Sequence, residues 1–197
     1  LPICAPTGRA AKRLTELLDT VRRCYKLDPE AEITLEANPD SADFRALRHL
    51  RRAGFNRLSL GMQSSCPGEL ASIHRIHTPA QTDAALGSAR RAGFQNLSLD
   101  LIYGLPGQTM ESWQASVEHA LSLGPEHLSC YGLKVEEGTP LARRVAGGEV
   151  LPDDDAQADL YLWTVDRLRQ AGLAQYEISN FARPGFESRH NLKYWTL

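Results

Sequence analysis

Three polar side chains near the ends of three short apolar segments have the residue types and the spacing of a binding site. The residues are Glu36 in ITLEAN, Gln63 at the end of RLSLGMQ, and Asp100 in LSLDLI. Side chains alternate across a strand, so each segment places apolar residues on one face and its polar residue on the other. Carboxylates and amides bind hydroxyl and amino groups through hydrogen bonds. We therefore expect the three side chains to converge on a polar, nucleoside-like ligand at one mouth of a curved parallel sheet.

A repeated unit of helix followed by strand would carry these residues. The segment RRAGFNRLSLGMQ begins at Arg51 and returns as RRAGFQNLSLDLI at Arg90. Each copy has a glycine, Gly54 or Gly93, where a helix needs a left-handed final residue. The predicted helices span residues 13–25, 43–52, 79–91, 110–123 and 156–171, and the predicted strands span 32–37, 57–63, 97–103 and 127–133.

The alternation of strands and helices predicts an α/β fold with parallel strands and outer helices, because βαβ connections are right-handed and build parallel sheets. A flat sheet that is covered by helices on both sides requires two apolar faces, whereas these strands have one polar face. A partial (β/α) barrel around a polar ligand is therefore favoured. The alternative is that each polar group is buried and forms hydrogen bonds with neighbouring backbone groups. That interpretation is less convincing when three polar residues lie in register. Ser41 is expected to cap the helix over 43–52, and Thr109 with Ser112 the helix over 110–123.

Composition and charge exclude several classes of function. The 197 residues include 22 basic and 24 acidic side chains spread along the chain, and this net charge of -2 argues against a nucleic-acid partner. No apolar run reaches the roughly 18 residues of a membrane span, and no signal-peptide pattern is found. We expect a cytoplasmic protein. It divides into an atypical N-terminal segment and helix (1–30), a partial barrel (31–140) and a C-terminal extension (141–197).

The cysteines and histidines have no metal-binding spacing. Four cysteines stand far apart in the sequence: Cys4, Cys24, Cys66 and Cys130. Because they form neither CxxC nor CxxxCxxC, local spacing predicts neither zinc nor an iron–sulfur cluster. Cytosolic cysteines are expected to be reduced, and Cys130 lies among apolar strand residues. His74 and His77 form an HxxH pair for which no further metal ligands are evident.

Several motifs in a fixed order carry a resemblance to a known family. They are ITLEANP, GFNRLSLGMQS, IHRIHT, LSLDLIYGLPGQT, HLSCYGLKVEEGTPL, QYEISNFA and HNLKYW, which lie between residues 32 and 195. In this order they resemble the radical S-adenosylmethionine (SAM) superfamily. Within it they resemble the HemW family of haem chaperones and the related oxygen-independent coproporphyrinogen III oxidases. The resemblance implies a partial (β/α) barrel in which a [4Fe–4S] cluster holds SAM.

The resemblance also implies roles for individual residues. Four residues would contact SAM: Glu36, Gln63, Arg75 and Asp100. The ribose diol and the amine of SAM suit carboxylates and amides, and its carboxylate suits Arg75, whose alternative is a solvated surface arginine. His190 of HNLKYW would contact haem, because a neutral imidazole can ligate iron; its alternative is a histidine that orders the loop. The implied partners are haem and the proteins that accept it.

The beginning of the sequence departs from the family. Family members carry CxxxCxxC on the first barrel strand and GGGTP after the second strand, and these 197 residues contain neither. Three closely spaced thiolates hold a [4Fe–4S] cluster and leave one iron open for SAM. We therefore expect a chain truncated at both ends, with an open sheet edge beside the strand of Glu36. Alone, it is expected neither to bind a cluster nor to cleave SAM, and no catalytic residue or metal ligand is assigned.

Two functions from different classes fit the motifs. The first is a haem chaperone of radical SAM descent, which HNLKYW and YEISNFA favour. The alternative is an enzyme, an oxygen-independent coproporphyrinogen III oxidase of porphyrin biosynthesis that converts propionates to vinyl groups. An unrelated phosphate-binding barrel is disfavoured, because YGLPGQT lacks the lysine and the GxxxxGK[ST] spacing of a phosphate loop.

Overall fold

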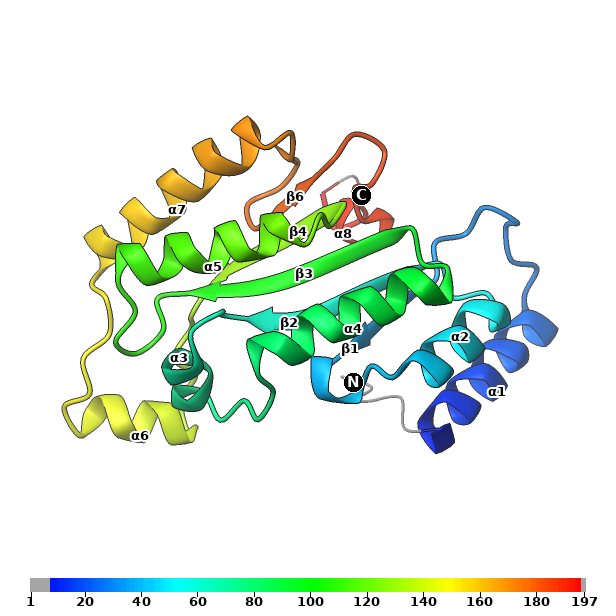
Figure 1. Cartoon of the computed structure of the whole chain (residues 1–197), viewed down its shortest axis with the longest axis horizontal. Coiled ribbons are helices and arrows are strands. Elements are labelled where there is room, and N and C mark those ends of the chain that lie inside the picture. Colours follow the sequence, from blue (N-terminus) through cyan, green and yellow to red (C-terminus); the bar gives the residue numbers. More distant parts are fainter. Residues whose placement is uncertain (1–7, 196–197) are drawn as a thin grey trace.

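The computed structural model describes residues 8–195 and has a six-stranded sheet at its centre (Figure 1). In chain order the strands are β1 (Thr34–Ala37), β2 (Arg57–Gln63), β3 (Asn96–Tyr103), β4 (His127–Gly132), β5 (Ala174–Gln175) and β6 (Asn180–Ala182). Their order across the sheet is β1-β2-β3-β4-β6-β5. Strands β1 to β4 are parallel, whereas β6 pairs antiparallel with both β4 and β5. The predicted α/β fold with a mainly parallel sheet is confirmed.

Helices precede, connect and follow the strands of the sheet. They are α1 (Gly8–Cys24), α2 (Phe44–Ala53), α3 (Pro67–Ser72), α4 (Pro79–Ala92), α5 (Met110–Ser122), α6 (Pro140–Ala146), α7 (Asp154–Gln170) and α8 (Arg189–Leu192), with a 3-10 turn, η1, over Pro39–Ser41. Figure 1 shows α4 and α5 lying along one face of the strands. The connections β2–α4–β3 and β3–α5–β4 are therefore the expected βαβ units.

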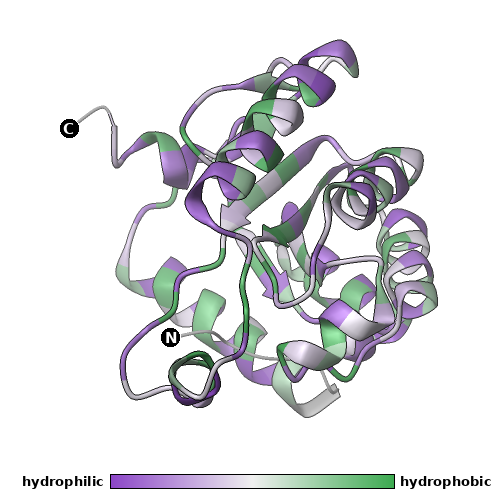
Figure 2. Cartoon of the chain, turned by 90° about the vertical axis from the view of Figure 1, so that its left-hand side faces the viewer, coloured by the Kyte–Doolittle hydropathy of each residue, from purple (hydrophilic) through white to green (hydrophobic). Residues whose placement is uncertain are grey.

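The leucines of the parallel strands form the core. Alternate residues of β2 and β3 are fully buried: Leu58, Leu60, Leu97 and Leu99. Helix α2 adds Leu47 and Leu50 to the same core, and α5 adds Trp113. Burying one such leucine stabilises the fold by roughly 1.5–3 kcal/mol. Figure 2 shows hydrophobic positions gathered where the helices meet the sheet.

The ends of the helices follow the expected chemistry at the repeated glycines and at α5. Gly54 and Gly93 end α2 and α4 with φ of 111° and 98°, in the left-handed region that glycine adopts without strain. At the start of α5, Thr109 and Ser112 form a capping box, in which each side chain accepts a hydrogen bond from the other's backbone N–H. These predictions are confirmed, and the glycines explain how each helix turns sharply into the next strand.

The expected cap of α2 was wrong. Ser41 lies in η1, and Asp43 caps the helix by accepting a hydrogen bond from the backbone N–H of Ala46 at 2.9 Å. The cause is the 3-10 turn that follows Asn38, which adds residues between strand and helix. Helices α3, α6 and α8 and the antiparallel pairing of β5 and β6 were not predicted.

The last part of the chain contributes to the same sheet as the first. β5 and β6 follow residue 141, yet β6 pairs directly with β4 through Ser129 and Asn180. The proposed division of the chain at that residue stays a prediction. Within residues 8–195, no helix combines the length and the apolar character that crossing a membrane requires.

Candidate functional site

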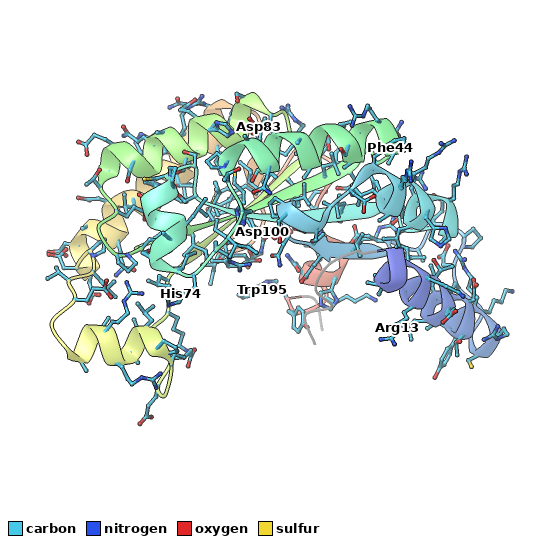
Figure 3. The ribbon with its side chains drawn as sticks, turned by 60° about the horizontal axis from the view of Figure 1, so that its bottom comes forward. Arg13, Phe44, His74, Asp83, Asp100 and Trp195 are labelled. Carbon is cyan, nitrogen blue, oxygen red and sulfur yellow. The ribbon has the colours of Figure 1, made fainter. Side chains whose placement is uncertain are left out.

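The side of the sheet away from α4 and α5 is polar. Its residues, which we call the polar face, are Glu36, Arg57, Ser59, Ser98, Asp100, His127 and Ser129. Register explains why they gather: Glu36 pairs with Ser59, and Asp100 pairs with Ser129, and paired residues project to the same side. Figure 3 shows Asp100 on this side of the strands and Asp83 of α4 on the other.

Asp100 is the central carboxylate of the polar face. The hydroxyl of Ser59 on β2 lies 2.9 Å from both of its oxygens and donates to them. Burial raises the pKa of Asp100 above its ordinary value, and the hydroxyls of Ser129 and Ser59 and the charge of Arg57 offset this only in part. The charge of Glu36, which lies on the same face two strands away, raises that pKa further. Together the two carboxylates form an acceptor pair that suits hydroxyl or amino groups.

A second group lies at the carboxyl ends of β1 and β2. Arg75, in the loop after α3, donates from Nη1 to Oδ1 of Asn38 at 2.9 Å. The amide of Gln63 folds over Gly61, where an added Cβ would lie 2.6 Å from Gln63 Nε2 and 3.7 Å from Asn38 Oδ1. Asn38 follows Glu36 by two residues and projects to the same face, so the two groups are adjacent. Arg75, Asn38 and Gln63 thus gather at the carboxyl ends of β1 and β2, on the same face as Glu36 and Asp100, and their contact with SAM stays a prediction.

An irregularity in β2 aims Gln63. The pairing of β2 with β3 shifts between Leu60 and Gln63, and Gln63 has φ of 64°. A left-handed conformation is uncommon for a residue other than glycine and is found at functional positions. Sequence reasoning placed Gln63 on the polar face by simple alternation, and it did not name Asn38 as a site residue. The sequence feature that could have identified Asn38 is its position two residues after Glu36, which places both side chains on the same face.

His190 lies apart from this mouth. It is exposed on α8, its ring packs edge-to-face on Tyr194 at 5.2 Å, and its Nε2 lies 3.3 Å from the Tyr194 hydroxyl. Figure 3 shows that α8 and Trp195 lie on the same side of the sheet as Asp100. The structure describes no contact between His190 and the other four predicted site residues.

A buried histidine, missed by sequence reasoning, connects the polar face to α8. Nδ1 of His127 lies 2.8 Å from Ser98 Oγ, and its Nε2 lies 2.7 Å from the hydroxyl of Tyr176. That hydroxyl also accepts hydrogen bonds from the N–H of Ser188 and the amide of Asn191. Burial lowers the pKa of His127 to about 3, with a further contribution from Arg57, so the ring is neutral. The sequence feature that could have identified His127 is its position two residues before Ser129, which places both side chains on the same face of the strand.

The described residues do not fit an iron–sulfur cluster. Cys24 is exposed, Cys66 is partly buried and Cys130 is buried, and residues 8–195 contain no group of three potential metal ligands. Cys4 lies outside the described residues. His74 is exposed, whereas His77 is buried with Nε2 at 3.0 Å from the carbonyl of Met62, so they form no pair. SAM does fit, because Arg75, Gln63, Glu36 and Asp100 supply a cation, an amide and two carboxylates at one mouth.

The sequence matches known proteins over nearly its whole length. Residues 5–120 match the family model of the Radical SAM superfamily. The chain is 47% identical over 191 residues to heme chaperone HemW of Mycobacterium tuberculosis and 39% identical over 190 residues to HemW of Escherichia coli. These alignments cover 96% of this chain but 49% and 50% of the relatives. The chain thus spans about half the length of the curated relatives it matches.

The fold also matches solved structures. Coproporphyrinogen III oxidase (HemN) from Escherichia coli, described as a radical SAM enzyme, has a TM-score of 0.80 and 30% identity, over 93% of this chain and 42% of that chain. Elp3 from Methanocaldococcus infernus shares the fold alone, with a TM-score of 0.62 at 22% identity over 68% of this chain and 32% of that one. The chain belongs to the radical SAM superfamily.

Proposed function

We propose that this chain is the SAM-binding part of a haem chaperone of the HemW kind, acting in the cytoplasm. The observation that carries the proposal is the group of Arg75, Asn38 and Gln63 beside the carboxylates of Glu36 and Asp100. The 47% identity to a heme chaperone HemW supports the choice of function within the superfamily. Haem and its acceptor proteins are the proposed partners.

Each residue of the mouth has a role that its chemistry suits. The guanidinium of Arg75, which Asn38 holds in place, binds the carboxylate of SAM through charge-assisted hydrogen bonds. The exposed carboxylate of Glu36 and the partly buried one of Asp100 accept hydrogen bonds from hydroxyl and amino groups of the ligand. The amide of Gln63 donates one hydrogen bond and accepts another. SAM, when bound, supplies the adenosyl group.

The direct test of the SAM site is calorimetric titration of the chain with SAM. We expect Glu36→Gln and Arg75→Met each to weaken binding by about tenfold or more, since each removes a charge-assisted hydrogen bond. Arg45→Met is the matched control, because Arg45 is exposed on α2. Absence of SAM binding by the unaltered chain, or equal binding by all three variants, would contradict the proposal.

Haem binding is tested separately, by following the absorbance of added haem. The imidazole of His190 on exposed α8 is the proposed haem contact, and His190→Ala is expected to weaken binding by about tenfold. His49→Ala is the control, because His49 is exposed on α2. Equal haem affinity of the chain and its His190→Ala variant would remove this assignment.

The similarity to coproporphyrinogen III oxidase (HemN), at a TM-score of 0.80, keeps a second function open. An oxidase would convert coproporphyrinogen III when the complete protein is assayed with SAM and a reductant. Conversion of that substrate without haem binding would favour the oxidase over the chaperone.

A further inference from the structure

Arg57 is a buried cation on the polar face that the proposed SAM site does not use. It begins β2, it is 4% exposed, and its neighbours in register are Thr34 of β1 and Asn96 of β3. Its Nε atom is buried without a hydrogen-bond partner among residues 8–195. None of the ion pairs in that part of the chain includes it.

The charge of Arg57 reaches the centre of the polar face. It lowers the pKa of Asp100 and of His127, which places the guanidinium near both groups. Asp100 accepts its hydrogen bonds from Ser59, and both ring nitrogens of His127 are already engaged. The neighbouring side chains therefore leave Nε of the guanidinium without an acceptor.

A buried guanidinium nitrogen that lacks an acceptor destabilises a protein, and arginine cannot lose its charge by deprotonation. The planar guanidinium presents two parallel donors, which match the two oxygens of a carboxylate. A doubly charged phosphate matches less well, because the carboxylate of Asp100 lies near the single cation. We propose that Arg57 binds a carboxylate group of a ligand that enters the polar face.

Helix α8 indicates where that ligand lies. The hydroxyl of Tyr176 lies 2.7 Å from His127 on the polar face and 3.2 Å from the backbone nitrogen of Ser188 at the start of α8. A carboxylate at Arg57 therefore lies on the side of the sheet that carries α8. Two sources supply this chemistry: a propionate of haem, which rests on the proposed function, and a small free carboxylate, which does not.

The first arm of the test uses formate as the probe. Thermal unfolding of the chain is measured in sodium formate and in sodium chloride of equal ionic strength. We expect formate to raise the Tm of the unaltered chain and of the control variant Arg45→Met, and to leave the Tm of Arg57→Met unchanged. Arg57→Met is expected to have a higher Tm than the unaltered chain in chloride, because methionine removes a buried charge whose Nε lacks an acceptor. Arg57→Lys keeps the charge but lacks the two parallel donors, and should respond weakly to formate if Arg57→Met does not fold.

The second arm compares haem with haem dimethyl ester, whose propionates carry no charge. If a propionate reaches Arg57, the unaltered chain binds haem about tenfold more tightly than the ester, and Arg57→Met binds both equally. A formate response without this preference assigns the site to a small carboxylate. If neither compound binds, the haem part of the proposed function fails, and the formate arm still decides the role of Arg57. Absence of a formate effect together with equal affinity for haem and ester overturns the inference.

Discussion

Glu69 is a buried carboxylate and Asp100 a partly buried one, in two regions of the molecule whose surroundings differ. Glu69 of α3 is 4% exposed and accepts three hydrogen bonds, from Ser64 Oγ at 2.6 Å, Ser112 Oγ at 2.5 Å and Gln108 Nε2 at 3.0 Å. These donors come from the segment after β2, the loop after β3 and the first turn of α5. The carboxylate of Glu69 therefore connects these three segments through hydrogen bonds.

Asp100, by contrast, lies partly buried on the polar face. Serine hydroxyls are its hydrogen-bond donors, and burial raises its pKa although the charge of Arg57 lowers it in part. A carboxylate whose acceptor sites are filled by its own chain stabilises the fold. A carboxylate whose pKa is raised by burial costs stability when it is ionised, which is the expected state of a group that binds a ligand.

The largest expected effect on the free energy of unfolding is that of replacing Glu69. Glu69→Ala leaves three donors without an acceptor and opens a cavity, so we expect the free energy of unfolding to fall by about 3–5 kcal/mol. Urea denaturation measures the change. Glu137→Ala, at an exposed position, is the control and should stay within about 0.5 kcal/mol of the unaltered chain. A loss as small as that of the control would remove the structural role of Glu69.

The second prediction concerns how the stability of the chain depends on pH through His127 on the polar face. The pKa of His127 in the folded chain, about 3, lies below its ordinary value, so the unfolded chain binds the proton more readily. The stability that neutral His127 supplies is present above pH 6.5 and is lost as the pH falls toward 3. Between pH 7 and pH 5 it should decrease by about 2 kcal/mol. His127→Gln, which keeps hydrogen-bonding groups at this position, should lack this component; parallel pH profiles for both proteins would contradict the assignment.

The smallest effect on stability, with the opposite sign, is expected at Asp100. Because its pKa is raised in the folded chain, the ionised form disfavours folding at neutral pH. Asp100→Asn should therefore raise the free energy of unfolding at pH 7 and lose that advantage as the pH falls. The same variant should weaken SAM binding in calorimetry. A loss of stability like that of Glu69→Ala would place both carboxylates in one structural class.

The main elements of the fold could be predicted because their signals are local. Alternating leucines marked the parallel strands, and Gly54 and Gly93 marked the ends of two helices. Helices α3, α6 and α8 have 6, 7 and 4 residues, which is too short for a helical period to emerge. β5 and β6 have 2 and 3 residues, and their antiparallel pairing depends on contacts distant in sequence.

Some residues of the candidate site could likewise be predicted from local sequence patterns, and others could not. Glu36 and Asp100 were identified by alternation within their own strands. The hydrogen bond between Arg75 and Asn38 joins residues 37 positions apart, and its geometry depends on how α3 ends. Nor does the sequence distinguish Arg57 at the start of a strand from a solvated arginine, because its burial results from the packing of later segments.

Position 61 offers a way to control one ligand contact without altering the residue that makes it. A methyl group there would occupy the space of the Gln63 amide, which is the mobile end of a side chain and can turn away at small energetic cost. Gly61→Ala would therefore behave as a remote deletion of that amide, in a protein that still folds and still contains glutamine.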